Sequence, residues 1–198
     1  MILVTCAHLL EAKSMINKFY LEKKSGLPFS LFGNDEINLL ITNQEIKNTL
    51  KSLQKYFSYL NQKNFPLKIY NFGICAALDF SLSLEEVVFV ETISHCKEIY
   101  SSHSHQVKKV NRFREVSCLS VSEPIFDLKT NASLRKKYQV LDMELSAIVK
   151  IATLNEIPWA SYKMVSDYAN SIVSLEDIRK IAQTASDKFS QILQSEVL

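Results

Sequence analysis

The stretch Val140–Asp167, VLDMELSAIVKIATLNEIPWASYKMVSD, decides how this chain folds. It opens with an apolar run ending in Asp142-Met143-Glu144, continues in a helical pattern, and closes with a second apolar run ending in Ser166-Asp167. Each run predicts a buried strand with carboxylates at its C-terminal end, which is where open α/β sheets bind their ligands. We therefore expect an α/β protein with a site at these two strand ends.

Each strand end, taken alone, has two interpretations. Asp142 can cap the following helix, Glu144 suits the first turn of that helix, and Asp167 can be a turn residue. The functional alternative is that a partly buried Glu144 accepts hydrogen bonds from two adjacent hydroxyls, since a carboxylate offers two acceptor oxygens. In the same interpretation, burial of Asp167 raises its pKa, so that it can act as a general acid.

Composition narrows the class of protein and of partner. The chain has 198 residues, of which 47% are apolar and 22% charged, as in an ordinary globular protein. One domain spanning residues 1–198 is the simplest organisation. The net charge of +2 is too small to favour nucleic acid or a membrane surface, so a small-molecule substrate is expected. Three glycines are too few for a glycine-rich nucleotide loop, and no cofactor is expected.

The cysteines and the N-terminal residues bear on location. Four widely spaced cysteines are typical of free thiols in a reducing compartment. Residues 1–7 predict a strand and lack the basic segment of a signal peptide, and no apolar run reaches the roughly 20 residues of a membrane span. We expect a cytoplasmic protein.

Working outward from the quoted stretch, strands and helices alternate, which predicts a single three-layer α/β/α domain with a central twisted mixed sheet. A capping-box-like Ser174 begins the last helix. Residues 94–114 lack periodicity and are expected to be a long loop or an irregular extension. The other predicted elements are a strand at 2–6, a helix ending before Gly26, a hairpin at 29–41, a helix at 46–60, and strands at 67–72, 87–90 and 116–121.

Two further segments are candidates for chemistry. Glu11 stands at the start of the first helix, where it either faces water or acts as a general base. The segment Asn71–Leu78 ends a strand with small residues, which either pack tightly or let the backbone approach a flat ligand.

Histidines and a cysteine cluster in one irregular stretch, but their spacing matches no standard zinc pattern, so no metal site is expected. The residues concerned are His95, Cys96, His103 and His105.

Together these segments resemble the purine nucleoside phosphorylase and 5'-methylthioadenosine/S-adenosylhomocysteine nucleosidase superfamily. The likeness covers nearly the whole chain, and Val140–Asp167 is its most specific part. The matching positions, in chain order, are Ala7 with Glu11, Asn71–Leu78 including Gly73 and Ile74, a loop aromatic at Phe126, Met143-Glu144 and Ser166-Asp167.

The resemblance implies cleavage of an N-glycosidic bond. Glu144 would hold the ribose hydroxyls with Met143 beneath the sugar, Ser166 and Asp167 would contact the purine, and Phe126 would stack on it. Asp167 would protonate the leaving base and Glu11 would activate water, a division of labour like that of the two carboxylates in glycosidases. The family also implies a homodimer.

Water is the expected nucleophile, because a phosphate nucleophile requires cations. The arginines that phosphorylases of this superfamily carry near the first helix and before the glycine segment are missing here, where Ala12 and Tyr70 stand. A phosphate-dependent phosphorylase remains an alternative, because a neighbouring subunit could lend Arg112 or Arg114.

The chain also departs from the family pattern. Ile74 stands where methylthioadenosine nucleosidases usually carry serine, Ala76 and Ala77 where they carry glycines, and Asn43-Gln44 where a glycine-containing turn is typical. Gly73-Ile74 is similar to the Gly-Ile of futalosine hydrolases, so that activity is an alternative. A nucleoside-binding protein without activity is another.

Overall fold

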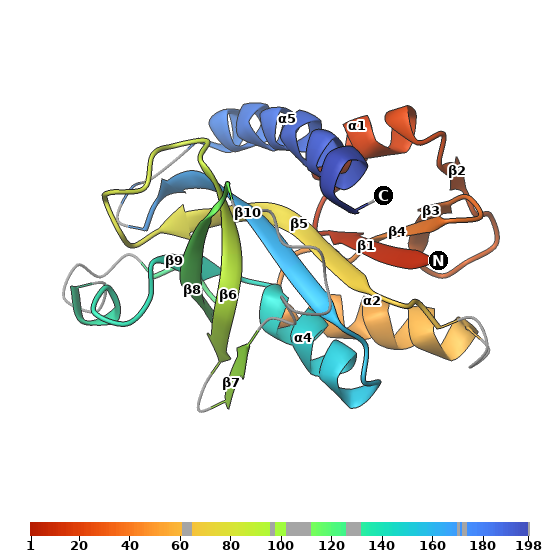
Figure 1. Ribbon diagram of the computed structural model, residues 1–198, viewed down its shortest axis with the longest axis horizontal. Helices are drawn as coiled ribbons and strands as arrows, with labels where there is room; N and C mark the ends of the chain where they lie inside the picture. The colour runs from red at the N-terminus through yellow and green to blue at the C-terminus, as the bar shows by residue number, and fades with distance from the viewer. Residues whose placement is uncertain are drawn as a thin grey trace.

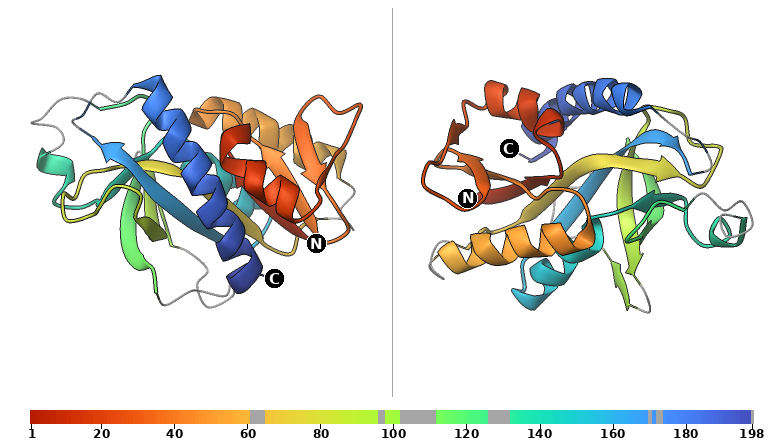
Figure 2. Two further views of the ribbon diagram at one scale, coloured as in Figure 1. Left: turned by 90° about the horizontal axis from the view of Figure 1, so that it is seen from above. Right: turned by 180° about the vertical axis from the view of Figure 1, so that it is seen from behind.

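The computed structural model describes residues 1–60, 65–95, 98–101, 112–125, 132–169, 171 and 174–197. A twisted mixed sheet lies between two pairs of helices (Figure 1), which confirms the predicted three-layer arrangement. The first helix pair is α1 (Leu9–Lys18) and α5 (Leu175–Ile192), and the second is α2 (Ile46–Tyr59) and α4 (Leu145–Leu154). Figure 2 shows α1 and α5 crossing the same face, and a π-helical turn, η2 (Leu193–Val197), follows α5.

The strands pair in the order β10-β6-β8-β9-β5-β1-β4-β3-β2, and β7 pairs with β6. Because β10 also pairs with β5, five strands close into a ring from which β1, β4, β3 and β2 extend. The strands are β1 (Ile2–Cys6), β2 (Glu22–Lys23), β3 (Ser30–Gly33), β4 (Ile37–Ile41), β5 (Ile69–Ala77), β6 (Val87–His95), β7 (Glu98–Ser101), β8 (Arg114–Ser120), β9 (Val140–Asp142) and β10 (Trp159–Tyr168).

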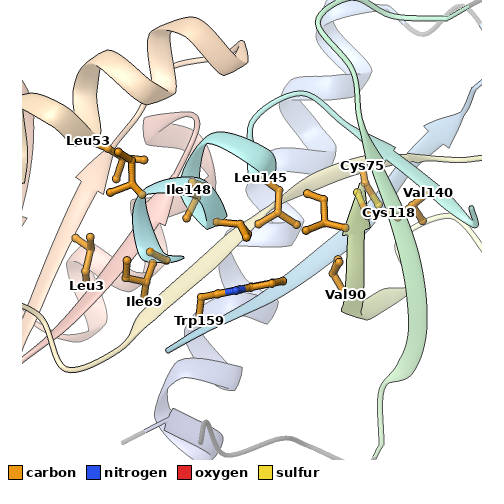
Figure 3. Close-up of a cluster of buried hydrophobic side chains, with 14 of the residues drawn as sticks. Leu3, Leu53, Ile69, Cys75, Val90, Cys118, Val140, Leu145, Ile148 and Trp159 are labelled. Carbon is orange, nitrogen blue, oxygen red and sulfur yellow. The ribbon is translucent and has the colours of Figure 1, made fainter. Parts of the chain in front are cut away.

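Two apolar cores hold the layers together, one on each side of the sheet. The core beneath α2 and α4 includes Leu53, Ile148 and Trp159 (Figure 3). The core beneath α1 and α5 includes Met15, Phe72 and Phe189. Since both faces of the sheet are covered, its central strands are apolar at nearly every position rather than at alternate ones.

Most predicted elements are confirmed. The hairpin of β3 and β4 is antiparallel, and Ser174 caps α5 by accepting a hydrogen bond from the Asp177 amide at 3.1 Å. The long loop or irregular extension expected at 94–114 is wrong over part of its length, because β6 runs to His95, β7 follows, and β8 starts at Arg114. The strand β7 and the C-terminal half of β6 were missed because short edge pairings, such as Ile93 opposite Tyr100, leave no periodic signal.

No helix in the described part of the chain is both long enough and apolar enough to cross a membrane.

Candidate functional site

The site lies where β5 exchanges one neighbour for another. Along one edge β5 pairs with β10, while along the other it pairs with β1 at 69–71 and with β9 at 76–77. Gly73 and Ile74 fall between these two pairings. We call this stretch of the edge, between the pairing with β1 and the pairing with β9, the gap in β5. A side chain can bond to the backbone there, and the Ile74 amide donates to Oε1 of Glu11 at 3.1 Å.

Glu11 reaches this gap from the first turn of α1. Its second oxygen, Oε2, accepts from the His8 amide at 2.8 Å, and the residue is 1% exposed. The interpretation of Glu11 as a water-facing helix residue is therefore wrong. A carboxylate held by two backbone amides has a fixed orientation, as a general base requires.

A cavity of about 270 Å³ opens beside the gap and collects five of the predicted site residues. Ile74, Met143, Glu144, Ser166 and Asp167 line it. The rest of its described lining is Gln44, Cys75, Ala76, Val121, Pro124, Ile125, Leu141, Asp142, Ala169, Ser171 and Ile178.

Four predicted residues are not in that lining. Glu11 and Gly73 lie next to Ile74 at the gap in β5, where Glu11 accepts the hydrogen bond from the Ile74 amide. Ala7 is buried, and its carbonyl accepts from the Asn43 amide at 3.1 Å, which anchors the loop carrying Gln44. Phe126 lies outside the described residues.

A local irregularity in β10 turns two successive residues toward the cavity. The register of β10 against β5 shifts between Val165 and Asp167, so Asp167 lies opposite Ala76. Successive residues of a regular strand point to opposite faces, and a bulge removes that constraint. Ser166 and Asp167 can therefore line the same cavity.

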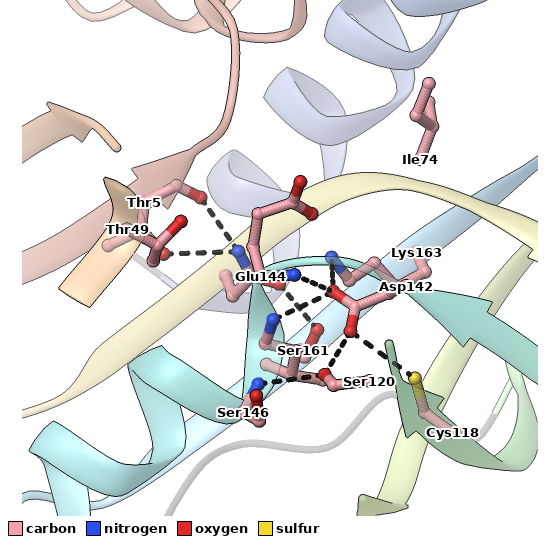
Figure 4. A network of polar contacts seen from close by, with 12 residues as sticks. Thr5, Thr49, Ile74, Cys118, Ser120, Asp142, Glu144, Ser146, Ser161 and Lys163 are labelled. Carbon is pink, nitrogen blue, oxygen red and sulfur yellow. Dashed lines mark hydrogen bonds and ion pairs between the residues drawn. The ribbon is translucent and has the colours of Figure 1, made fainter. Parts of the chain in front are cut away.

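Asp142 is both a helix cap and an ion-pair partner. Its Oδ2 accepts from the amides of Glu144 at 3.2 Å and Leu145 at 2.9 Å, which confirms the capping interpretation. The same oxygen lies 2.9 Å from Nζ of Lys163, and both side chains are almost fully buried. Figure 4 shows Asp142 between Lys163 and Ser120, whose hydroxyl donates to Oδ1. Burial raises the pKa of Asp142, but Lys163 and these hydrogen bonds lower it by more.

Lys163 is the site residue that sequence reasoning missed. Burial lowers the pKa of this amine, and the charges of Asp142 and Glu144 raise it by more, so it is a buried cation. The available signal was a lysine inside the otherwise apolar run of β10, because lysine is rarely buried unless it is paired.

Glu144 points away from the Asp142 contacts, as Figure 4 shows, and lines the cavity. Burial, with smaller effects from Asp142 and Glu11, raises its pKa to about 8. Lys163 and a hydrogen bond from the backbone of Glu45 act in the opposite direction. The free site therefore holds Glu144 close to the balance between its protonated and ionised forms near neutral pH.

Asp167 has the surroundings of a proton donor. Burial raises its pKa, and the hydroxyl of Ser166, which contacts Oδ1, offsets part of that rise. The same hydroxyl donates to the Cys75 carbonyl at 3.1 Å. The Ser166 hydroxyl therefore lies between Asp167 and the backbone of β5, which fixes where the carboxyl group sits in the cavity.

The histidine-rich stretch lies at the edge of the described residues. His95 Nδ1 is 3.0 Å from the Ser120 carbonyl, whereas Cys96, His103 and His105 lie outside them.

Substitution of Gly73 tests the geometry of the gap. A Cβ at this position would lie 3.2 Å from Nζ of Lys163 and 3.5 Å from Oε1 of Glu11. We expect Gly73→Ala to destabilise the fold by about 1–3 kcal/mol, because the lysine must move within a packed interior. Urea unfolding of both proteins measures the difference. An unchanged free energy of unfolding would show that the gap can hold a methyl group without displacing Lys163.

Comparisons with solved structures show where else this fold occurs. A search of curated protein sequences found no match. The fold is similar to that of Arabidopsis thaliana 5'-methylthioadenosine nucleosidase (TM-score 0.78, 15% identity, covering 98% of this chain and 94% of that one). It is also similar to the 5'-methylthioadenosine/S-adenosyl homocysteine nucleosidase of Campylobacter jejuni (TM-score 0.78, 11% identity, 98% of each chain). Futalosine hydrolase of Helicobacter pylori matches with a TM-score of 0.76 and 13% identity, over 98% and 97% of the chains.

The sequence itself identifies the family. Residues 89–197, more than half of the chain, match the family described as the phosphorylase superfamily. This match includes Met143-Glu144 and Ser166-Asp167, two of the motifs that carry the resemblance. The chain belongs to the phosphorylase superfamily.

Proposed function

We propose that this protein hydrolyses the N-glycosidic bond of a purine or 5'-modified purine nucleoside. The observation that carries the proposal is the meeting of three carboxyl groups at the gap in β5. Glu144 and Asp167 line one cavity, and Glu11 is bonded to the backbone of Ile74, which lines it too. Family membership and a fold shared with nucleosidases support the same reaction.

Each carboxyl group has a distinct task in the proposed reaction. Glu11 takes a proton from water, whose oxygen attacks C1' of the ribose while the bond from C1' to the purine nitrogen breaks. The bonding electrons pass to the purine, and Asp167 donates its proton to N7 of the leaving base. Ionised Glu144 accepts hydrogen bonds from the 2'- and 3'-hydroxyls and stabilises the positive charge that develops on the sugar.

Water is preferred over phosphate because of the charges around the cavity. Its described lining contains Asp142, Glu144 and Asp167 but no arginine or lysine. Lys163, the buried cation nearby, is already paired with Asp142. Arg114 is bound to Asp79 and Ser81 on the surface. Among the described lining residues, a phosphate ion would thus meet carboxyl groups and no cation to bind it.

Two activities are candidates, and they differ in the 5'-substituent of the nucleoside that is cleaved. The fold is shared with methylthioadenosine nucleosidases and with futalosine hydrolase, and Ile74 lines the cavity where a serine is usual in the former. The homodimer and the cytoplasmic location implied at the sequence level stay predictions.

A substrate panel tests the reaction and the nucleophile together. Purified protein is assayed for free base from methylthioadenosine, adenosylhomocysteine, futalosine, inosine and adenosine, with and without phosphate. We expect release from at least one of them at a rate that phosphate does not change, and a much lower rate for Glu11→Gln. Strict dependence on phosphate would establish a phosphorylase. Binding without release would establish an inactive homologue.

A further inference from the structure

Lys163 is held in place by contacts that leave it no route to solvent. It lies in the middle of β10 and is 1% exposed. Its Nζ is 2.9 Å from Oδ2 of Asp142, whose own side chain is fully buried. Removing a lysine and an aspartate from water is costly, so a buried pair of this kind is weak evidence for a role in stability alone.

The neighbouring strand makes room for this cation. Gly73 of β5 is the register partner of Lys163. A Cβ on Gly73 would touch both the ammonium group and Oε1 of Glu11, at 3.2 Å and 3.5 Å. The absence of a side chain at this position therefore leaves space that the ends of Lys163 from β10 and Glu11 from α1 both border.

Asp142 and Glu144 both interact with this one cation. Glu144 is faced by Asp142, Lys163 and Glu11, and the two acidic neighbours disfavour its ionisation while Lys163 favours it. Lys163 is in turn influenced by both Asp142 and Glu144. Without the ammonium group, ionised Glu144 would stand among negative charges in a buried site, which like charges and burial both oppose.

We propose that Lys163 is a positioning residue of the site, whose ammonium group is anchored by Asp142 and balances enough negative charge to let Glu144 ionise and bind the ribose hydroxyls. Lys163 is absent from the described cavity lining, so it acts through Glu144 rather than on the substrate. The inference rests on the proposed function for its purpose. The charge relation between Lys163 and Glu144 can be measured without any substrate.

The test is a pH titration of the Glu144 carboxyl group by carbon NMR on protein labelled at the glutamate side-chain carboxyls. The signal is assigned by its absence in Glu144→Gln. We expect Lys163→Met to move the midpoint upward by about 1–3 pH units, and Asp142→Asn to move it downward. Lys163→Arg should restore most of the wild-type midpoint. Exposed Lys150 of α4 provides the matched control, and Lys150→Met should leave the midpoint in place.

A variant that leaves Asp142 buried without a partner can fail to fold. The double variant Asp142→Asn/Lys163→Met avoids this, because it removes both charges. Compared with Asp142→Asn alone, the double variant should titrate Glu144 at a higher pH. Midpoints that stay the same in these variants, with only the unfolding temperature lowered, would show that the ion pair is purely structural and would overturn the proposal.

Activity assays separate this inference from the proposed function. If the wild-type protein releases base, the rise of kcat/KM with pH should shift in each variant in the same direction as the NMR midpoint. If it releases no base from any nucleoside, the proposed function fails, while the NMR midpoints still decide whether Lys163 sets the charge on Glu144.

Discussion

Replacing Asp167 with asparagine is expected to slow release of the purine by about 10²- to 10⁴-fold, the usual contribution of a general acid. Asparagine has nearly the same shape and can still hydrogen-bond Ser166, but it has no proton to give to N7. The cavity should therefore keep its form and the substrate its binding mode. Initial rates at saturating and at low nucleoside concentration measure the effect on kcat and on kcat/KM.

A substrate whose leaving group needs no proton separates chemistry from binding. A 4-nitrophenyl riboside leaves as a stable anion, so Asp167→Asn should cleave it at close to the wild-type rate. Asp35→Asn, at the exposed turn between β3 and β4, is the matched control and should retain full activity on both substrates. Equal loss on the nitrophenyl and purine substrates would mean that Asp167 positions the sugar instead of protonating the base.

The pH dependence of the same reaction adds a second check. Because burial raises the pKa of Asp167, the wild-type protein should lose activity as rising pH removes that proton. Asp167→Asn should lack this alkaline decline, since it has no group to titrate at that position. An identical decline in the variant would assign the ionisation to another residue.

The local features of this fold were predictable from sequence, whereas its long-range pairings were not. Ser174 as a helix cap, the β3 and β4 hairpin, and the carboxylates at the ends of β9 and β10 each depend on a few neighbouring residues. The closure of β10 against both β5 and β6 depends on register between distant strands. Buried strands without alternating polarity carry no signal for that register.

In the candidate site, too, some residues were predictable from sequence and one was not. The resemblance predicted that Glu144 and Asp167 share a site, and both line the cavity. Lys163 was missed because its role depends on Asp142, 21 residues earlier, and on the missing side chain of Gly73. Neither relation follows from the spacing of residues within one strand.

Glu144→Gln is expected to raise the stability of the fold at alkaline pH while removing activity. The carboxyl group of Glu144 has a pKa of about 8 in the folded protein, against an ordinary value of 4.5. A group whose pKa is raised by folding favours the folded state fully below its unfolded pKa, and that contribution is lost as pH rises through the folded pKa. The wild-type protein should therefore lose stability on the order of a few kcal/mol between about pH 5 and pH 9 from this residue.

Glutamine does not ionise, so the variant does not lose stability in this way as pH rises. The difference in free energy of unfolding between the two proteins therefore reports on Glu144 rather than on other titrating groups. Urea unfolding at about pH 5 and pH 9 should give similar stabilities at the lower pH and a more stable variant at the higher pH. Exposed Glu91 of β6 provides the control, since Glu91→Gln should change neither value. A pH-independent difference between wild type and Glu144→Gln would place the ionisation of Glu144 outside this range.

For the reaction, loss of two charge-assisted hydrogen bonds to the ribose hydroxyls should lower kcat/KM by roughly 10²- to 10⁴-fold. Gain in stability together with loss of activity is the result expected where a buried carboxylate is kept for catalysis at the expense of the fold.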